Sequence, residues 1–242
     1  MNLQKWGKAL LHRTTLRNDF LLAPGTPYVD EIGRDLDRTF PKCKWFLPHR
    51  PQLLELLNTY AYVNSGMGYC QGMNFVLFVL YKKFYVDSVK DARIRTYYAF
   101  HRLINVIRPV YPLNSKDTRP LQFSSKIASF VCILVSKHSI KLKRPLKHIV
   151  CIIINQTLPA LFLNKYNVED ATLILDYIIN KDDKVMFRKI LSILVAIVLR
   201  FESVFVHLDE CQILQIINIR EYYEVNKILS ISKRIYNSLS LQ

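Results

Sequence analysis

Apolar residues recur at steps of three and four along much of this chain, the spacing that places them on one face of an α-helix. One such stripe consists of Leu53, Leu54, Leu57, Tyr60 and Ala61. A second consists of Met186, Ile190, Leu194 and Val198, and Asp182 or Asp183 can cap its helix. Residues 73–81 are largely apolar and long enough to start a buried helix. The pattern predicts an all-α protein built from many helices in a single domain.

Two features leave the pattern less uniform. The segment Val168–Ile179 has helical spacing, but its β-branched residues also fit a strand. Prolines interrupt the chain at Pro109, Pro112, Pro120 and Pro145, where they are expected to separate helices. No internal repeat and no low-complexity linker divides the sequence.

Composition agrees with one continuous core. The chain has 242 residues, of which 50% are hydrophobic, enough to bury a sizeable core. The cysteines form no Cys-x-x-Cys pair and are odd in number, which argues against a disulfide framework; they are Cys43, Cys70, Cys132, Cys151 and Cys211. The histidines are scattered without a His-Glu-x-x-His, so the sequence predicts no metal site and no cofactor of its own. With no signal-peptide pattern at its start and no apolar run long enough to span a bilayer, we expect a cytoplasmic protein.

Positive charge is in clear excess. Lys and Arg total 34 against 19 Asp and Glu, giving a net charge of +15 and a pI near 9.6. No acidic residue lies between Asp117 and Glu169, and the stretch Lys137–His148 concentrates basic side chains. Three interpretations stay open: a solvated basic face, a peripheral contact with an anionic membrane, and nucleic-acid binding. Nucleic acid is the least favoured of the three, because no recognition helix, zinc finger or aromatic-basic motif accompanies the charge.

The first segment with chemical character runs from Ile32 to Pro41. Ile32, Asp35 and Arg38 are three residues apart, so a helix places them on one face. Asp35 can then accept a charge-assisted hydrogen bond from the Arg38 guanidinium and orient it. Pro41 disfavours helix at the residue before it and is expected to end the element near Arg38. Taken alone, this spacing also fits a surface ion pair worth about 0–1 kcal/mol.

The second segment is the only glycine-dense stretch of the chain. Three of the six glycines lie within residues 66–72, and the run Gly68–Asn74 reads Gly-Tyr-Cys-Gln-Gly-Met-Asn. Glycine at this density indicates a turn or a close approach of two backbones. The Lys-Ser/Thr of a phosphate-binding loop is absent, so this is no nucleotide site. The alternative is a tight turn between core helices, with Gln71 as a helix-start residue.

Together the two segments resemble the TBC domain, the catalytic module of Rab GTPase-activating proteins. Ile32, Asp35 and Arg38 match the family's Ile-x-x-Asp-x-x-Arg motif, and Tyr69-Cys70-Gln71 matches its Tyr-x-Gln motif. Weaker landmarks follow in the expected order at Leu161-Phe162, Ile174–Ile178 and Lys184–Arg188. The resemblance extends from about Glu31 to Ala196. It implies a lead-in of helical structure over residues 1–30, the TBC domain over 31–219, and a C-terminal helix over 220–242 that packs on the domain.

The resemblance implies a mechanism in which this chain supplies catalytic groups to a partner. Rab GTPases hydrolyse GTP slowly, because the developing phosphoryl charge is poorly neutralised and the attacking water is poorly placed. Arg38 matches the family's arginine finger and Gln71 its glutamine finger, with Asp35 and Tyr69 as supporting residues. The implied partner is a Rab in its GTP form, which brings GTP and Mg²⁺ itself. The chain would act as an enzyme activator in vesicle trafficking, cytoplasmic and peripheral on endomembranes.

Several residues depart from the family pattern. The stretch Asn155–Pro159 lacks the family's Trp before Leu-Phe, and Pro159 within that helix is expected to remove one backbone hydrogen bond and kink it. Leu175 replaces the Trp of the Ile-Trp-Asp landmark, and Trp6 is the match for the family's opening segment. These departures leave a competing hypothesis, a Rab-binding module with the TBC fold but weak or no catalytic effect. A third is an unrelated helical adaptor whose motifs match by chance.

Overall fold

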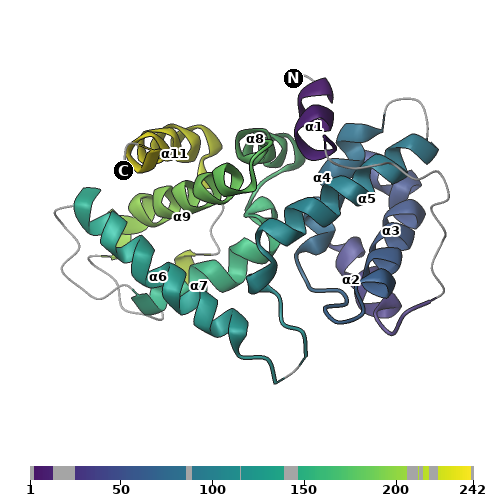
Figure 1. Cartoon of the computed structure of the whole chain (residues 1–242), viewed down its shortest axis with the longest axis horizontal. Coiled ribbons are helices and arrows are strands. Elements are labelled where there is room, and N and C mark those ends of the chain that lie inside the picture. The colour runs from purple at the N-terminus through teal and green to yellow at the C-terminus, as the bar shows by residue number, and fades with distance from the viewer. Residues whose placement is uncertain are drawn as a thin grey trace.

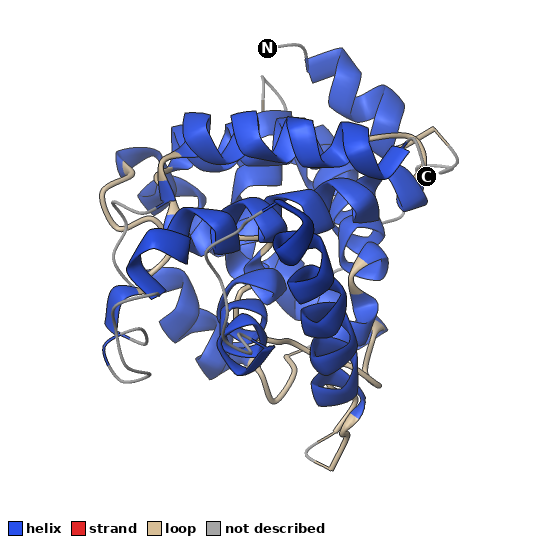
Figure 2. Ribbon diagram, turned by 90° about the vertical axis from the view of Figure 1, so that its left-hand side faces the viewer, coloured by secondary structure: helices blue, strands red, loops and turns tan. Residues whose placement is uncertain are grey.

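The regular structure of the chain is helical. The computed structural model describes residues 3–12, 25–85, 89–114, 116–138, 147–205, 212, 215–217 and 223–240. Throughout these ranges every regular element is a helix, which confirms the all-α prediction (Figure 2). The α-helices are α1 (Leu3–Leu10), α2 (Val29–Asp37), α3 (Arg50–Val63), α4 (Met73–Phe84), α5 (Val89–Val106), α6 (Arg119–His138), α7 (Lys147–Thr157), α8 (Val168–Ile178), α9 (Asp183–Phe205) and α11 (Val225–Ser240). Short 3₁₀ helices are η1 (Lys44–His49), η2 (Arg108–Val110), η3 (Leu158–Ala160) and η4 (Leu163–Lys165).

The helices form two groups that lie side by side (Figure 1). One group contains α2 to α5, arranged around α4, whose side chains are almost all buried. The other contains α6 and α7 paired with each other, and α9 covered by α11 and α8. Contacts of α4 with η3, η4 and α8 join the groups. The start of α4, immediately after the glycine-rich segment, therefore lies at this junction.

Helix α1 spans the opposite side of the same junction. Trp6 is fully buried, and its indole N–H donates to Asp176 Oδ1 of α8 at 3.0 Å. Lys5 Nζ lies 3.2 Å from the same oxygen. The residue expected to match the family's opening segment thus contacts the Asp of the Ile-Leu-Asp landmark. This contact fixes α1 to the second group of helices.

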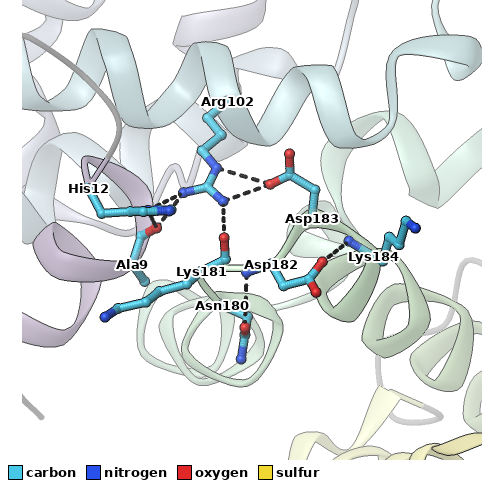
Figure 3. Close-up of polar contacts among 8 residues, drawn as sticks. All are labelled: Ala9, His12, Arg102, Asn180, Lys181, Asp182, Asp183 and Lys184. Carbon is cyan, nitrogen blue, oxygen red and sulfur yellow. Dashed lines mark hydrogen bonds and ion pairs between the residues drawn. The ribbon is translucent and has the colours of Figure 1, made fainter.

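A cluster around Arg102 of α5 strengthens that attachment (Figure 3). The Arg102 guanidinium donates to the carbonyl oxygens of Ala9 and Lys181 and to Asp183 Oδ1, the last at 2.7–3.0 Å. One side chain therefore joins α1, α5 and the start of α9. Because guanidinium has five N–H donors in a fixed plane, it can serve three segments at once.

The segment with mixed helix and strand character is helical. Asn167 caps α8, its Oδ1 accepting a hydrogen bond from the Asp170 backbone N–H at 2.8 Å. The stripe of α8 that faces the core consists of Val168, Ala171, Ile174, Leu175 and Ile178, all buried. A local cap and a buried stripe at helical spacing together outweigh the strand preference of β-branched residues.

Three observations concern the predictions made for the basic stretch, for membrane spans and for the C-terminal segment. Of the basic stretch Lys137–His148, residues 139–146 lie outside the described residues. No helix in the described part of the chain is long and apolar enough to cross a membrane. Helix α11, within the predicted C-terminal segment, packs on α9 and α8.

Candidate functional site

The centre of the candidate site is the carboxylate of Asp35, buried near the end of α2. Its side chain is 3% exposed, and each of its two oxygens has a separate partner. Arg38 Nη2 donates to Oδ1, and the Tyr69 hydroxyl donates to Oδ2 at 2.7 Å. One carboxylate therefore joins the arginine of the first motif to the tyrosine of the second. The interaction between Asp35 and Arg38 is the one predicted from their spacing.

Arg38 lies where α2 ends, as the position of Pro41 predicts. The helix stops at Asp37, Arg38 occupies the C-cap, and Phe40 adopts a left-handed conformation with φ of 45°. The Phe40 ring is buried between Phe75 and Phe78 of α4, at centroid distances of 5.2 and 5.0 Å. This packing holds the turn, while the Arg38 side chain stays 59% exposed. The guanidinium is thus oriented by the buried Asp35 and remains accessible to solvent.

Asn74, in the first turn of α4, makes a second connection between the motifs. Its Nδ2 donates to Thr39 Oγ1 at 2.6 Å and to the Asp35 carbonyl oxygen at 3.2 Å. Its Oδ1 accepts from the Gly72 N–H at 3.0 Å. Sequence reasoning assigned no role to Asn74 or Thr39. The signal that could have revealed Asn74 is a lone amide at the start of an otherwise apolar helix, which must be hydrogen-bonded when buried.

Two glycines of the second segment, Gly68 and Gly72, lie at points of close packing. Gly68 has φ of 66°, and a Cβ there would lie 2.3 Å from the ring of Tyr28, which covers the turn. Gly72 has φ of 104°, and a Cβ there would lie 2.9 Å from the backbone of Pro159 and Ala160. The turn is therefore held on both sides by close contacts that only glycine allows.

Gln71 is the exposed residue between these fixed points. Tyr69 before it and Gly72 after it are buried, whereas Gln71 is exposed and forms no hydrogen bond within the described part of the chain. It precedes the helix-capping residue Gly72, so it is not the helix-start residue of the alternative interpretation. A free amide on a rigid turn is able to hydrogen-bond a molecule from outside.

Burial determines the protonation of the two side chains before Gln71. Burial, followed by the hydrogen bond to Asp35, raises the pKa of Tyr69 far above its ordinary value, so its hydroxyl remains a donor. Burial raises the pKa of Cys70 to about 11, with a further contribution from Glu31. Because the thiolate is the reactive form of cysteine, Cys70 is not a nucleophile near neutral pH.

A cavity of about 380 Å³ opens beside Gln71. It lies between the start of α4 and the end of α7, and polar side chains of α7 and η4 line it; these are Asn155, Gln156, Asn164 and Lys165. Phe75 and Pro159 supply part of its apolar wall. This cavity could not be predicted from residue spacing, because its lining comes from segments about 80 residues apart.

The prediction that Pro159 kinks a helix is wrong. Helix α7 ends at Thr157, and Pro159 lies in the first turn of η3, where its missing N–H removes no helical hydrogen bond. The Pro159 carbonyl accepts from the Tyr111 hydroxyl at 2.8 Å. Leu161 and Phe162, which follow Ala160, are buried with φ of 48° and 69°. The Leu-Phe landmark is therefore a sharp, buried turn that supports the backbone against which Gly72 rests.

The described residues offer no other chemical centre of the kinds considered. No group of three or more His, Cys, Asp or Glu within them could hold a metal ion.

Comparison with known proteins identifies the family. The profile of the Rab-GTPase-TBC domain family matches residues 15–205, which is most of the chain. The chain belongs to this family, as the two motifs indicated. Among solved structures, the crystal structure of the Chlamydomonas flagellar RabGAP TBC domain is similar, with a TM-score of 0.60 and 14% sequence identity. The match covers 95% of this chain and 78% of that one, and it shows the shared fold. A search of curated protein sequences finds no significant match.

Proposed function

We propose that this chain activates a Rab-family GTPase in its GTP form by inserting Arg38 and Gln71 into the partner's nucleotide site. The observation that carries the proposal is the Asp35 carboxylate, buried and bound on one oxygen by Arg38 and on the other by Tyr69. It couples an exposed guanidinium to the turn that presents an exposed amide. Family membership supports a Rab as the partner.

Each finger has a defined task in this proposal. Arg38 neutralises the charge that develops on the phosphoryl oxygens, and Gln71 orients the attacking water. Asp35 and Tyr69 are positioning residues, since they act only through the fingers. The Rab contributes GTP and Mg²⁺, so this chain is an activator and needs no cofactor of its own. Such an activity would end Rab signalling in vesicle trafficking, at the cytoplasmic side of endomembranes.

The test is single-turnover GTP hydrolysis by a panel of Rabs with wild-type and variant chains. We expect Arg38→Ala to lower the stimulated rate by about 10³–10⁵. Gln71→Ala should also lose the stimulation. Gln71→Ala should not measurably alter the unfolding midpoint in urea, because its side chain is exposed. Arg38→Ala should lower that midpoint modestly, because buried Asp35 loses the partner of one oxygen. Tyr69→Phe keeps the ring but removes the donor to Asp35, so it should lower the rate less than Arg38→Ala.

Matched controls are available on the same surfaces. Arg34 is exposed one turn before Arg38 on α2, and Gln122 is exposed on α6. Arg34→Ala and Gln122→Ala should retain the full stimulation. If Rabs bind the wild-type chain in their GTP state but none is accelerated, the chain is a binding module with the TBC fold and the two-finger mechanism is wrong.

A further inference from the structure

Helix α6 has apolar side chains on two opposite faces. Its inner face packs toward α7 and α9 through Ala128, Val131 and Val135, all at most 3% exposed. Its outer face exposes Phe130 by 40% and Ile133 by 57%. A helix that only completes the core needs no large apolar residues on its outer face. These two side chains are therefore available to contact a surface outside the fold.

The two apolar side chains lie between lysines in a single stripe. Lys126, Phe130, Ile133 and Lys137 follow one another at steps of four, three and four, which keeps them within about 60° of one direction around the helix. All four are exposed. We call this row of four residues the α6 stripe; at a rise of about 1.5 Å per residue it extends about 17 Å along the helix. Its order is basic, apolar, apolar, basic.

Nothing in the surrounding sequence neutralises the stripe. No Asp or Glu lies between Asp117 and Glu169, a span that includes all of α6 and α7. Within the described residues, neither Lys126 nor Lys137 forms an ion pair. The nearest acid at the start of α6, Asp117, is already engaged by Arg119 at 2.7 Å. The α6 stripe is thus an apolar ridge in a uniformly positive setting.

We propose that the α6 stripe docks this protein on an anionic lipid bilayer. Phe130 and Ile133 would enter the interface between headgroups and acyl chains, as the apolar face of an interfacial helix does. The lysines would extend their methylene stems past them, with their ammonium groups among lipid phosphates.

The geometry favours a bilayer over a protein groove or a nucleic acid. Contact with a bilayer requires only a narrow row of exposed apolar side chains on a surface helix, with a basic residue before it and another after it along the helix. Single-stranded nucleic-acid binding uses several aromatic side chains on which bases stack, whereas the α6 stripe has one aromatic residue, Phe130, beside an aliphatic one.

The proposed docking is compatible with the candidate GTPase site but does not depend on it. Figure 1 places α6 in one group of helices and α2, which ends directly before Arg38, in the other. The residues of the α6 stripe are also different from those of the candidate site. The α6 stripe can therefore be tested without any GTPase.

The test is co-sedimentation of the full chain with phosphatidylcholine vesicles, with and without phosphatidylserine. We expect binding only when phosphatidylserine is present. Lys126→Gln with Lys137→Gln should weaken partition by about fivefold for each lysine. A separate variant, Phe130→Ser with Ile133→Ser, should weaken partition by a factor of about ten while leaving the net charge of the protein unchanged. Circular dichroism verifies that each variant is folded.

Control variants separate the α6 stripe from general charge and hydrophobicity. Lys181→Gln with Lys233→Gln removes two exposed lysines from elsewhere, and Leu173→Ser removes an exposed apolar residue of α8. Both should bind like wild type. The proposal would be overturned by an equal loss of binding in these controls. It would also be overturned if the serine variant bound vesicles like wild type, or if the protein bound a nucleic acid but not vesicles. Should the serine variant fail to fold, the lysine variant and its control decide the matter alone.

Discussion

Asp35 shows why two similar-looking charges have different roles. The Asp35–Arg38 pair is not the kind exposed on both sides that contributes about 0–1 kcal/mol, because Arg38 is 59% exposed but Asp35 only 3%. Removal of Arg38 would leave one buried oxygen of Asp35 without its partner, at a cost of about 1–3 kcal/mol. Asp35 is 3% exposed, so its removal would leave the buried Tyr69 hydroxyl without an acceptor, at a cost of about 1–3 kcal/mol. The carboxylate is therefore structural and positioning at once, while the arginine is free to act on a partner.

Gly72 provides a prediction at the level of a single residue. Gly72→Ala places a Cβ 2.9 Å from the backbone of Pro159 and Ala160, at a φ of 104° that alanine rarely adopts. We expect a loss of about 2 kcal/mol in the free energy of unfolding, measured with urea, because both the conformation and the contact are strained. The adjoining Gln71 should shift with the turn, so the stimulation of a Rab should fall as well.

Gly66 in the same segment is the matched control for Gly72. A Cβ on Gly66 meets nothing within 4 Å, and its φ is not positive. Gly66→Ala should leave the free energy of unfolding within about 0.5 kcal/mol of wild type, or raise it slightly. Equal destabilisation by the two changes would contradict the assignment of Gly72 as the point of close backbone contact.

The sequence reveals local interactions within this site more readily than distant ones. The Asp35–Arg38 pair follows from helical spacing, and the end of α2 follows from Pro41, because both depend on a few neighbouring residues. The bond from Tyr69 to Asp35 joins residues 34 positions apart and was not predicted; the resemblance to the family implied only that both are supporting residues. The contact of Gly72 with Pro159 depends on where α7 ends, which residue spacing did not indicate.

At the level of elements, the attachment of α1 gives a pH dependence. Burial raises the pKa of Asp176, but hydrogen bonds from Trp6 and Lys5 outweigh burial and leave the pKa below its ordinary value of 3.8. A lowered pKa in the folded state means that the contribution to stability is present above pH 3.8 and is lost as pH falls through the folded value. Acid should therefore release α1 from α8.

Tryptophan fluorescence can follow this release. In a Trp45→Phe background Trp6 is the only tryptophan, and its emission should shift to longer wavelength as the pH falls below 3.8, when it becomes exposed. Asp176→Asn keeps an acceptor for the Trp6 N–H but has no carboxylate to protonate, so this transition should disappear. An identical acid transition in both chains would show that another group controls the docking of α1.

The helix assignments illustrate the same difference between local and distant information. The first residues of α8 and α9 follow from side-chain caps that act within two or three residues. Asn167 accepts from the Asp170 N–H, and Asp182 accepts from the Lys184 N–H, both at 2.8 Å. The pairing of α1 with α8 and of α6 with α7 depends on the whole chain, and helical periodicity does not indicate which apolar faces meet.

At the scale of the whole molecule, the fold extends past the segment that the family profile matches. The profile ends at residue 205, whereas α11 begins at Val225 and packs along α9 and α8. Its inner face includes Ile228, fully buried, and Ile235, 3% exposed. Since α9 is covered by α11, the stability of the core should depend on a helix that lies outside the segment matched by the family profile.

Ile228→Ala tests that dependence directly. Truncation of a fully buried isoleucine leaves a cavity and typically costs about 2–5 kcal/mol, so the thermal midpoint should fall by roughly 4–20 °C for a chain of this size. Ile133→Ala is the matched control, because Ile133 is the same residue type in a helix but 57% exposed, and its midpoint should stay near that of wild type. If Ile228→Ala unfolds at the wild-type temperature, α11 is an appendage and the core is complete without it. If the midpoint falls while Arg38-dependent stimulation persists at lower temperature, α11 stabilises the domain without taking part in the chemistry.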